Sequence, residues 1–222
     1  MPEVLLSARR VARRFGRRVV LEPIDLDLAE GEVVALGGPN GAGKSTLIAT
    51  LAGALAPSSG DVAAAEPTRV GWMPQQPALY RRLTPRENLA VFGQLAGLPR
   101  HEVRAAVEAA LAWTGLAARA RSRTCELSGG QQRRLNLAAG TLHRPSVLLL
   151  DEPTAGIDPQ AREEIHGLLG ELRARGMAIL LTTHDLDQAA ELADRIGILV
   201  DGRVRAEGTL AARIFGDYRA AL

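Results

Sequence analysis

The sequence contains little cysteine and few aromatic residues. Of its 222 residues one is cysteine, Cys125, and aromatic residues make up 3%. A single thiol cannot close a disulfide within the chain, so the fold does not depend on an oxidising compartment. Apolar residues make up 46% and charged residues 23%. That balance is typical of a packed globular domain and excludes disordered and collagen-like chains.

Lysine is almost absent as well. Of the 27 basic residues 26 are arginine, and the single lysine is Lys44. The formal net charge of +2 is too small to indicate a nucleic-acid partner, and we expect none.

Long apolar runs are also missing. The longest, such as 147–150 and 177–181, fall far short of the roughly 20 residues that span a bilayer. No apolar signal-peptide core follows Met1. We therefore expect a cytoplasmic protein.

Three arginine pairs occupy the first twenty residues: Arg9-Arg10, Arg13-Arg14 and Arg17-Arg18. Their spacing allows a basic amphipathic helix on a membrane, or an import peptide. The β-branched residues around them favour the other interpretation, an edge strand and a turn at Gly16 with solvated arginines.

Continuous apolar runs alternate with helical patterns, which is typical of a parallel sheet with crossover helices. The predicted buried strands cover 33–36, 147–150, 178–181 and 196–200, and the predicted helices between them cover 158–175 and 185–193. Residues 24–28 alternate apolar with acidic side chains, as a half-exposed antiparallel strand does. Between 77 and 143 the pattern is helical throughout, with helices expected at 84–96, 101–114 and 128–142.

A phosphate-binding loop follows the first buried strand. Its residues fit the pattern GxxxxGK[ST]: Gly38, Pro39, Asn40, Gly41, Ala42, Gly43, Lys44 and Ser45. The loop amides and the positive helix N-terminus would surround phosphate oxygens. Lys44 would lie between the β- and γ-phosphates, and Ser45 would ligate Mg²⁺. The sequence therefore predicts nucleotide binding.

Two carboxylates end the second buried strand. Asp151 could hold a water of Mg²⁺, and Glu152 could orient or deprotonate an attacking water. Such a pair next to a phosphate loop favours hydrolysis.

A second anion site is predicted at Ser128, Gly129, Gly130 and Gln131, where Ser128 caps a helix start that has two glycines. One chain has no need of two phosphate sites for one nucleotide. The two sites make sense if the nucleotide is held between two subunits.

Together these motifs resemble the ATP-binding subunit of an ABC transporter, and the resemblance covers essentially the whole chain. Residues 127–131 match the LSGGQ signature in full, Asp151 the magnesium strand, and Glu152 the catalytic glutamate. Asp158 lies in a segment like the D-loop, and His184 resembles the switch histidine. Gln75 resembles the Q-loop glutamine, with Gln76 beside it as the alternative; Phe15 stands where the family stacks an aromatic ring on adenine.

The resemblance implies an α/β fold: a P-loop NTPase core with a mainly parallel sheet, an N-terminal antiparallel β subdomain and an inserted α-helical subdomain. Residues 1–222 would form one cassette, with the core and β subdomain in 1–76 and 144–222, and the helical insertion carrying LSGGQ in 77–143. Glu152, His184 and Gln75 would be catalytic, and Ser45, Gln75 and Asp151 would bind Mg²⁺. The remaining implied ATP contacts include Phe15, the loop through Thr46, the signature residues and Asp158.

The resemblance also implies partners. Two copies would form a homodimer around ATP, and a separate integral membrane permease would hold the protein at the inner face of the membrane. Leu79, Tyr80 and Leu83 would offer it apolar contacts, unless they are core residues. Residues 75–89, 133–145 and 151–162 resemble ABC-2-type exporters; an importer subunit and a non-transport ABC ATPase are the alternatives. An inert module is disfavoured by the intact Lys44, Asp151 and Glu152, and a small-molecule kinase by LSGGQ.

Overall fold

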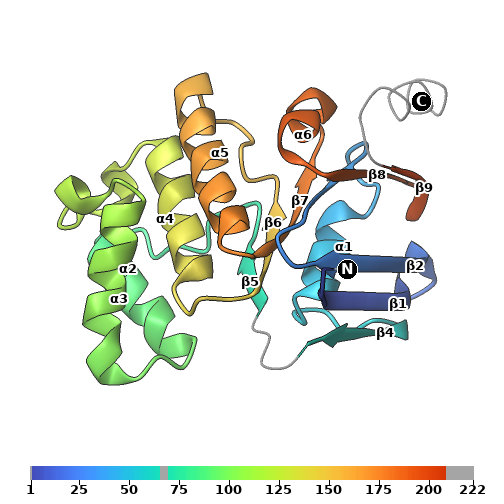
Figure 1. Ribbon diagram of the computed structural model, residues 1–222, viewed down its shortest axis with the longest axis horizontal. Helices are drawn as coiled ribbons and strands as arrows, with labels where there is room; N and C mark the ends of the chain where they lie inside the picture. Colours follow the sequence, from blue (N-terminus) through green and yellow to red (C-terminus); the bar gives the residue numbers. More distant parts are fainter. Residues whose placement is uncertain (1, 66–69, 209–222) are drawn as a thin grey trace.

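A computed structural model describes residues 2–65 and 70–208. It contains a six-stranded mixed sheet with helices on both faces, a three-stranded antiparallel sheet beside it, and a helical part at the opposite side (Figure 1). This arrangement confirms the predicted α/β fold with an antiparallel β part.

The larger sheet has the strand order β5-β6-β7-β3-β8-β9. Its first five strands are parallel, and only β9 runs antiparallel to its neighbour β8. Its strands are β3 (Val33–Gly37), β5 (Val70–Met73), β6 (Val147–Asp151), β7 (Ala178–Thr183), β8 (Arg195–Val200) and β9 (Arg203–Gly208). Every residue of β3, β6 and β7 is buried, as continuous apolar runs predict.

Alternate residues of β3 pack on opposite faces of the sheet. Val34 and Leu36 belong to the core that includes α1 (Lys44–Leu51). Val33 and Ala35 belong to the core that includes α5 (Pro159–Ala174), and α6 (Leu186–Leu192) contributes to that same core. Because β3 is covered on both faces, its carboxyl end, where the phosphate loop begins, is held in a fixed position.

The antiparallel sheet has the order β2-β1-β4, from β1 (Val4–Phe15), β2 (Arg18–Ala29) and β4 (Ser59–Ala64). The chain turns at Gly16 as predicted, with φ of 58°. The prediction of an edge strand before this turn is wrong. Strand β1 lies in the middle of this sheet, because β2 pairs with one side of it and β4 with the other. The short sequence Ser-Gly-Asp-Val-Ala-Ala of β4 carries almost no strand signal.

The helical part lies between β5 and β6. It holds α2 (Pro85–Leu95), α3 (Arg100–Trp113), two 3₁₀ helices (Ala117–Arg119 and Thr124–Glu126) and α4 (Gly129–Thr141). These bounds agree with the three predicted helices to within two residues. The part has its own hydrophobic core, which includes Leu89 and Leu135, whereas Leu137 of α4 packs into the core under the sheet. Helix α4 therefore ties the helical part to the sheet.

Among the described residues, no helix combines the length and the hydrophobicity needed to cross a membrane.

Candidate nucleotide site

The phosphate loop connects β3 to α1 and depends on its first glycine. Gly38 has φ of 150°, and a Cβ there would lie 2.1 Å from the carbonyl oxygen of Leu199. No other residue fits so close to β8. Helix α1 then begins at Lys44, with Gly43 in the left-handed conformation as its N-cap. The loop amides and the helix N-terminus therefore stand together, as the motif predicts.

Lys44 is 6% exposed, which is unusual for a lysine. Its ammonium donates hydrogen bonds to the carbonyl oxygens of Gly38 (2.7 Å) and Pro39 (3.1 Å). Burial lowers the pKa of the Lys44 ammonium, against the opposing effect of Glu152 and Asp151. The loop thus holds a buried cation whose hydrogen-bond acceptors are backbone carbonyl oxygens.

Asp151 and Glu152 follow one another at the end of β6, and Thr182 of the neighbouring strand β7 orients both. The Thr182 hydroxyl donates to Asp151 Oδ1 (2.6 Å) and accepts from the Glu152 amide (3.0 Å). Glu152 has φ of 47°, a left-handed conformation that costs a glutamate of the order of 1 kcal/mol. The backbone therefore leaves the extended conformation of β6 at Glu152.

The Glu152 carboxylate gathers the other predicted catalytic residues. His184 Nδ1 lies 3.2 Å from Oε2, and the Gln75 amide donates to the same oxygen at 3.5 Å. Lys44 Nζ lies 3.9 Å from Oε1. A small cavity of about 110 Å³ adjoins Glu152, and Thr154 and His184 are among the residues that line it. Three residues from three other segments thus lie around the Glu152 carboxylate.

Among the side chains that the structure describes, only three charged ones are buried, with less than a tenth of their surface exposed: Lys44, Asp151 and Glu152. Burying charge is costly, and such a cluster lowers stability relative to apolar packing. Groups retained at this cost usually serve a ligand or a reaction. The cluster is thus a candidate active site at the carboxyl ends of the parallel strands.

The predicted magnesium ligands are oxygen donors, which Mg²⁺ prefers. Ser45 is exposed at the start of α1, and Gln75 is exposed after β5. Asp151 uses Oδ1 for Thr182, which leaves Oδ2 for another interaction. Within the described chain no group of three His, Cys, Asp or Glu side chains is arranged to hold a metal. The donor set fits an ion that completes its coordination with phosphate and water.

The signature segment lies apart from the phosphate loop. Ser128 caps α4 and forms a reciprocal capping box with Gln131, and the first turn of α4 has no acidic residue. No hydrogen bond or ion pair among the described residues joins 128–131 to 38–46. Figure 1 shows α4 and α1 on opposite sides of β5 and β6. Within one chain, the two predicted anion sites are therefore separate.

Three other predicted ATP contacts have local partners. Phe15 is 46% exposed, and the Arg13 guanidinium lies 4.5 Å from its ring centre. Asp158 caps α5 by accepting from the Ala161 amide (2.9 Å). Thr46 is half-buried, and its carbonyl accepts from Thr50. Arg13 covers one face of the Phe15 ring, and the opposite face remains open to a ligand.

Gln75 and Gln76 differ in their surroundings. Both are exposed, but among the described residues only Gln75 donates a hydrogen bond to Glu152, through its side-chain amide. This geometry favours Gln75 as the Q-loop residue.

Two residues that the sequence did not single out support the site. Thr182 holds the Asp151 carboxylate and the Glu152 backbone amide, as described above. Arg133 of α4 donates to the carbonyl oxygen of Gln75 and to that of Ala155 (3.3 Å). It therefore joins the helical part to the loop after β5 and to the loop after β6. The sequence places Thr182 at the end of a predicted buried strand, but it does not show that this strand lies beside β6. Arg133 carried no signal, because arginines are frequent throughout this chain.

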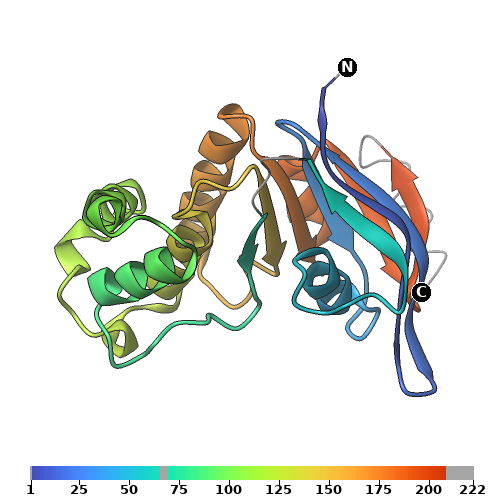
Figure 2. The same ribbon diagram turned by 90° about the horizontal axis from the view of Figure 1, so that it is seen from below.

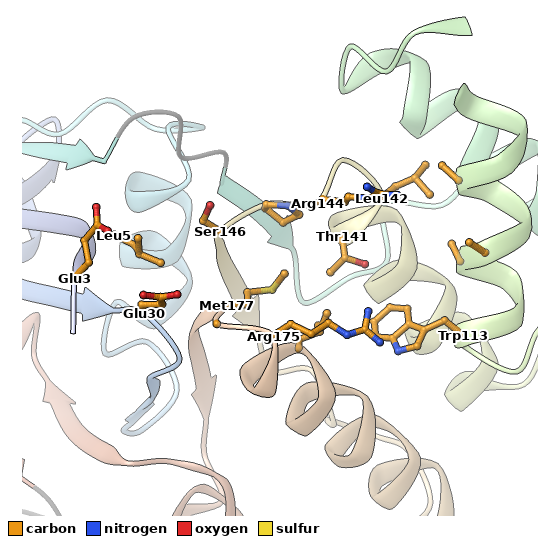
Figure 3. Close-up of a pocket in the computed structure, with 16 residues that line it drawn as sticks. Glu3, Leu5, Glu30, Trp113, Thr141, Leu142, Arg144, Ser146, Arg175 and Met177 are labelled. Atoms are coloured by element: carbon orange, nitrogen blue, oxygen red, sulfur yellow. The ribbon is translucent and has the colours of Figure 1, made fainter. Parts of the chain in front are cut away.

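A larger cavity of about 550 Å³ lies elsewhere, at the opposite edge of the sheet. Figure 3 shows Trp113 of α3, Arg175, Met177, Ser146 and Glu3 around it. Ser146 and Met177 directly precede β6 and β7, so this cavity faces the amino ends of the parallel strands. Ligands of open α/β sheets bind at the carboxyl ends. We therefore exclude this cavity from the candidate nucleotide site.

Comparison with known proteins supports the family resemblance. The model of the ABC transporter family matches residues 21–155. The linearmycin resistance ATP-binding protein LnrL of Bacillus subtilis (strain 168) is 36% identical over 96% of this chain and 73% of its own. The Nod factor export ATP-binding protein I of Paraburkholderia xenovorans (strain LB400) is 41% identical over 98% of this chain and 75% of its own.

Solved structures agree as well. An ATP-binding subunit of an ABC transporter superposes with a TM-score of 0.83 at 32% identity, over 96% of this chain and 93% of that one. A nucleotide-free ATP-binding cassette superposes with a TM-score of 0.85 at 26% identity, over 96% and 94%. The chain therefore belongs to the ATP-binding subunits of the ABC transporter family.

Proposed function

We propose that this subunit hydrolyses ATP with Mg²⁺ and powers export through a separate membrane permease. The observation that supports hydrolysis is the buried cluster of Lys44, Asp151 and Glu152 at the end of the phosphate loop. The relatives that export Nod factor or confer linearmycin resistance support the direction of transport. The first test is ATP turnover by the purified chain with and without Mg²⁺, and absence of Mg²⁺-dependent turnover would contradict the proposal.

In this proposal catalysis consists mainly of positioning and charge neutralisation. Ser45, Asp151 and Gln75 would hold Mg²⁺, which would supply Lewis-acid stabilisation of the phosphate charge. Lys44 exchanges its loop carbonyls for β- and γ-phosphate oxygens. Glu152 orients the attacking water and accepts its proton, and His184 and Gln75 hold the Glu152 carboxylate in place.

The separation of the two anion sites supports a dimer in which each ATP lies between two copies. The phosphate loop of one copy would face Ser128, Gly129, Gly130 and Gln131 of the other. The helix start at Ser128 is suited to phosphate because its exposed N-terminus has no competing acid. Asp158 would lie near the same junction, beside the cap that it forms on α5.

The signature glycines offer a matched test of the dimer. A Cβ at Gly129 would meet only the Ile157 methyl at 3.8 Å, whereas a Cβ at Gly130 would lie 2.5 Å from the Ala161 Cβ. We expect Gly129→Ala to leave the chain as stable or about 0.5–1 kcal/mol more stable, because alanine favours a helix. It should still lower ATP turnover by tenfold or more, because the new methyl group occupies the surface offered to the second copy.

The Gly130→Ala variant is the structural counterpart. Its clash should cost about 1–3 kcal/mol of unfolding free energy. Thermal unfolding and ATP turnover of both variants check the prediction. Normal turnover by a fully folded Gly129→Ala protein would contradict the dimer.

Phe15→Ala is expected to weaken ATP binding by about 1–3 kcal/mol, the usual value for stacking a base on an aromatic ring. Titration with a fluorescent ATP analogue measures the change. A matched control is Tyr80→Ala, since Tyr80 is 51% exposed but lies far along the chain in the helical part. Equal affinity of wild type and Phe15→Ala would show that another residue faces the adenine.

The segment after Gln75 is the proposed docking site for the permease, which would hold the subunit at the inner face of the membrane. Tyr80 is exposed, while Leu79 packs partly against the helical core and Leu83 is half-buried. The sequence prediction of three apolar contacts therefore applies best to Tyr80. Because Gln75 is in contact with Glu152 and begins this segment, docking here would be communicated directly to the catalytic carboxylate.

A further inference from the structure

Positive charge is concentrated in the helical part of the chain. Residues 77–143 contain ten arginines and four acidic residues, whereas the rest of the chain contains 17 basic and 21 acidic residues. The net charge of +2 is therefore the sum of a basic helical part and an acidic rest of the chain. The roles proposed above for the helical part use only Arg133 of the ten.

Six of these arginines have exposed side chains at the outer end of the helical part, and we call them the arginine face: Arg81, Arg82, Arg104, Arg119, Arg121 and Arg123. Backbone hydrogen bonds bring the two contributing loops together, since Cys125 donates to the Arg81 carbonyl and Thr124 to that of Leu83. Arg104 and Arg121 line one hollow together with Arg86, Glu87 and Glu108. Figure 2 shows both loops at the end of the helical part that is remote from the antiparallel sheet.

The arginine face lacks acidic partners. None of its six guanidinium groups forms an ion pair within the part of the chain that the structure describes. The nearby carboxylates are engaged elsewhere: Glu87 by the cap at Thr84, Glu108 by Arg86, and Glu126 by the backbone amide of Arg123. An anionic partner would therefore meet uncompensated positive charge.

We propose that the arginine face binds the phosphate headgroups of anionic phospholipids at the membrane surface. Guanidinium groups bind phosphate oxygens in bidentate fashion. Clusters of four to eight basic residues are typical of surfaces that bind anionic lipids, at about 1 kcal/mol per residue. Lipid headgroups form a mobile two-dimensional array, which suits six long, exposed side chains on an outward-facing surface.

The position of the arginine face supports a membrane rather than another anion. Arg81 and Arg82 directly follow Tyr80, which is the exposed residue of the proposed permease docking segment. This orientation rests on the proposed function, because docking to a permease would bring the same surface toward the bilayer. The arginines would then supplement the permease contact by holding the helical part against the headgroups.

The test is binding of the full chain to vesicles, which needs neither permease nor ATP. Vesicles of phosphatidylcholine containing about 30 mol% phosphatidylglycerol should sediment with the protein at low salt, whereas pure phosphatidylcholine vesicles should not. The triple variant Arg119→Gln, Arg121→Gln, Arg123→Gln should lose roughly 100-fold in partition coefficient, on about 1 kcal/mol for each arginine.

The matched control removes the same net charge from the other end of the molecule. Arg14→Gln, Arg17→Gln, Arg18→Gln changes three exposed arginines at the β1–β2 turn. This control should keep its vesicle binding within about threefold, and added inorganic phosphate at the same ionic strength should compete weakly with the wild type. Circular dichroism confirms that each variant is folded.

Three results would overturn the proposal. The first is absence of any preference for anionic vesicles. The second is an equal loss in both triple variants, which would indicate a response to net charge alone. The third is unchanged vesicle binding by the first triple variant, with loss only of its assembly with the permease, which would assign the arginines to an acidic protein segment. ATP binding, measured on the same samples, tests the proposed function separately.

Discussion

Replacing Glu152 with glutamine is expected to lower the kcat of ATP hydrolysis by about 10²–10⁴-fold, the usual contribution of a general base. Glutamine keeps the size of the side chain but has no basic oxygen for the proton of the attacking water. Its side-chain amide can still hydrogen-bond with His184 Nδ1 in either tautomer, through the carbonyl oxygen or the amide nitrogen, so the surrounding geometry is preserved. We expect ATP affinity to remain, because Lys44 and the loop amides are unchanged.

The measurement is steady-state ATP turnover together with ATP binding, and size-exclusion chromatography with ATP. Because bound ATP is no longer consumed, the Glu152→Gln protein should accumulate as a dimer. A suitable control is Glu163→Gln, which removes an exposed carboxylate from α5. Turnover above a tenth of the wild-type rate would show that the base is a different group.

The sequence predicted those parts of the fold whose signal is local. A strand buried on both faces must be apolar throughout, so β3, β6 and β7 could be recognised without any knowledge of their neighbours. The strands β4 and β9 lack that signal. In β9 the sequence alternates Arg203, Val204, Arg205, and pairing with β8 rather than its own composition makes it a strand. Placing β1 at the edge of its sheet failed for the same reason, since its second partner was not recognised.

The candidate site divides in the same way. The phosphate loop could be identified from the sequence because its chemistry needs consecutive residues with particular backbone freedom. Thr182 and Arg133 could not, because their roles depend on which strand lies beside β6 and which loops meet the side of α4. The convergence of Gln75, Glu152 and His184 was predicted only through the family resemblance, since these residues are separated by 77 and 32 positions.

The backbone conformation of Glu152 explains why the glutamate directly follows Asp151 at the end of β6. Asp151 ends β6 with ordinary strand geometry, while Glu152 turns to a φ of 47° immediately after it. Consecutive strand residues would point to opposite faces of the sheet. The left-handed residue instead brings the second carboxylate to the same edge as the phosphate loop, where Lys44 lies 3.9 Å away.

Lys44→Met is expected to weaken ATP binding by roughly 30-fold or more, since truncating one partner of a charged, buried contact costs about 2–5 kcal/mol. Methionine preserves most of the apolar stem and removes only the cation. Equilibrium titration with ATP checks the effect, and unchanged affinity would refute the role of Lys44. The matched control is Arg17→Met, which removes a cation from the exposed β1–β2 turn.

The same variant should also reveal how the buried charges depend on one another. Without the ammonium, Asp151 and Glu152 remain buried beside each other with weaker compensation, so Lys44→Met should lower the unfolding free energy by about 1–3 kcal/mol. Adding Glu152→Gln removes one of the two carboxylates and should restore part of that stability, a coupling that a double-mutant cycle measures. ATP affinity should stay low in the double variant, because glutamine supplies no cation for the phosphates. Additive stability changes would show that the 3.9 Å contact between Lys44 and Glu152 carries no energy.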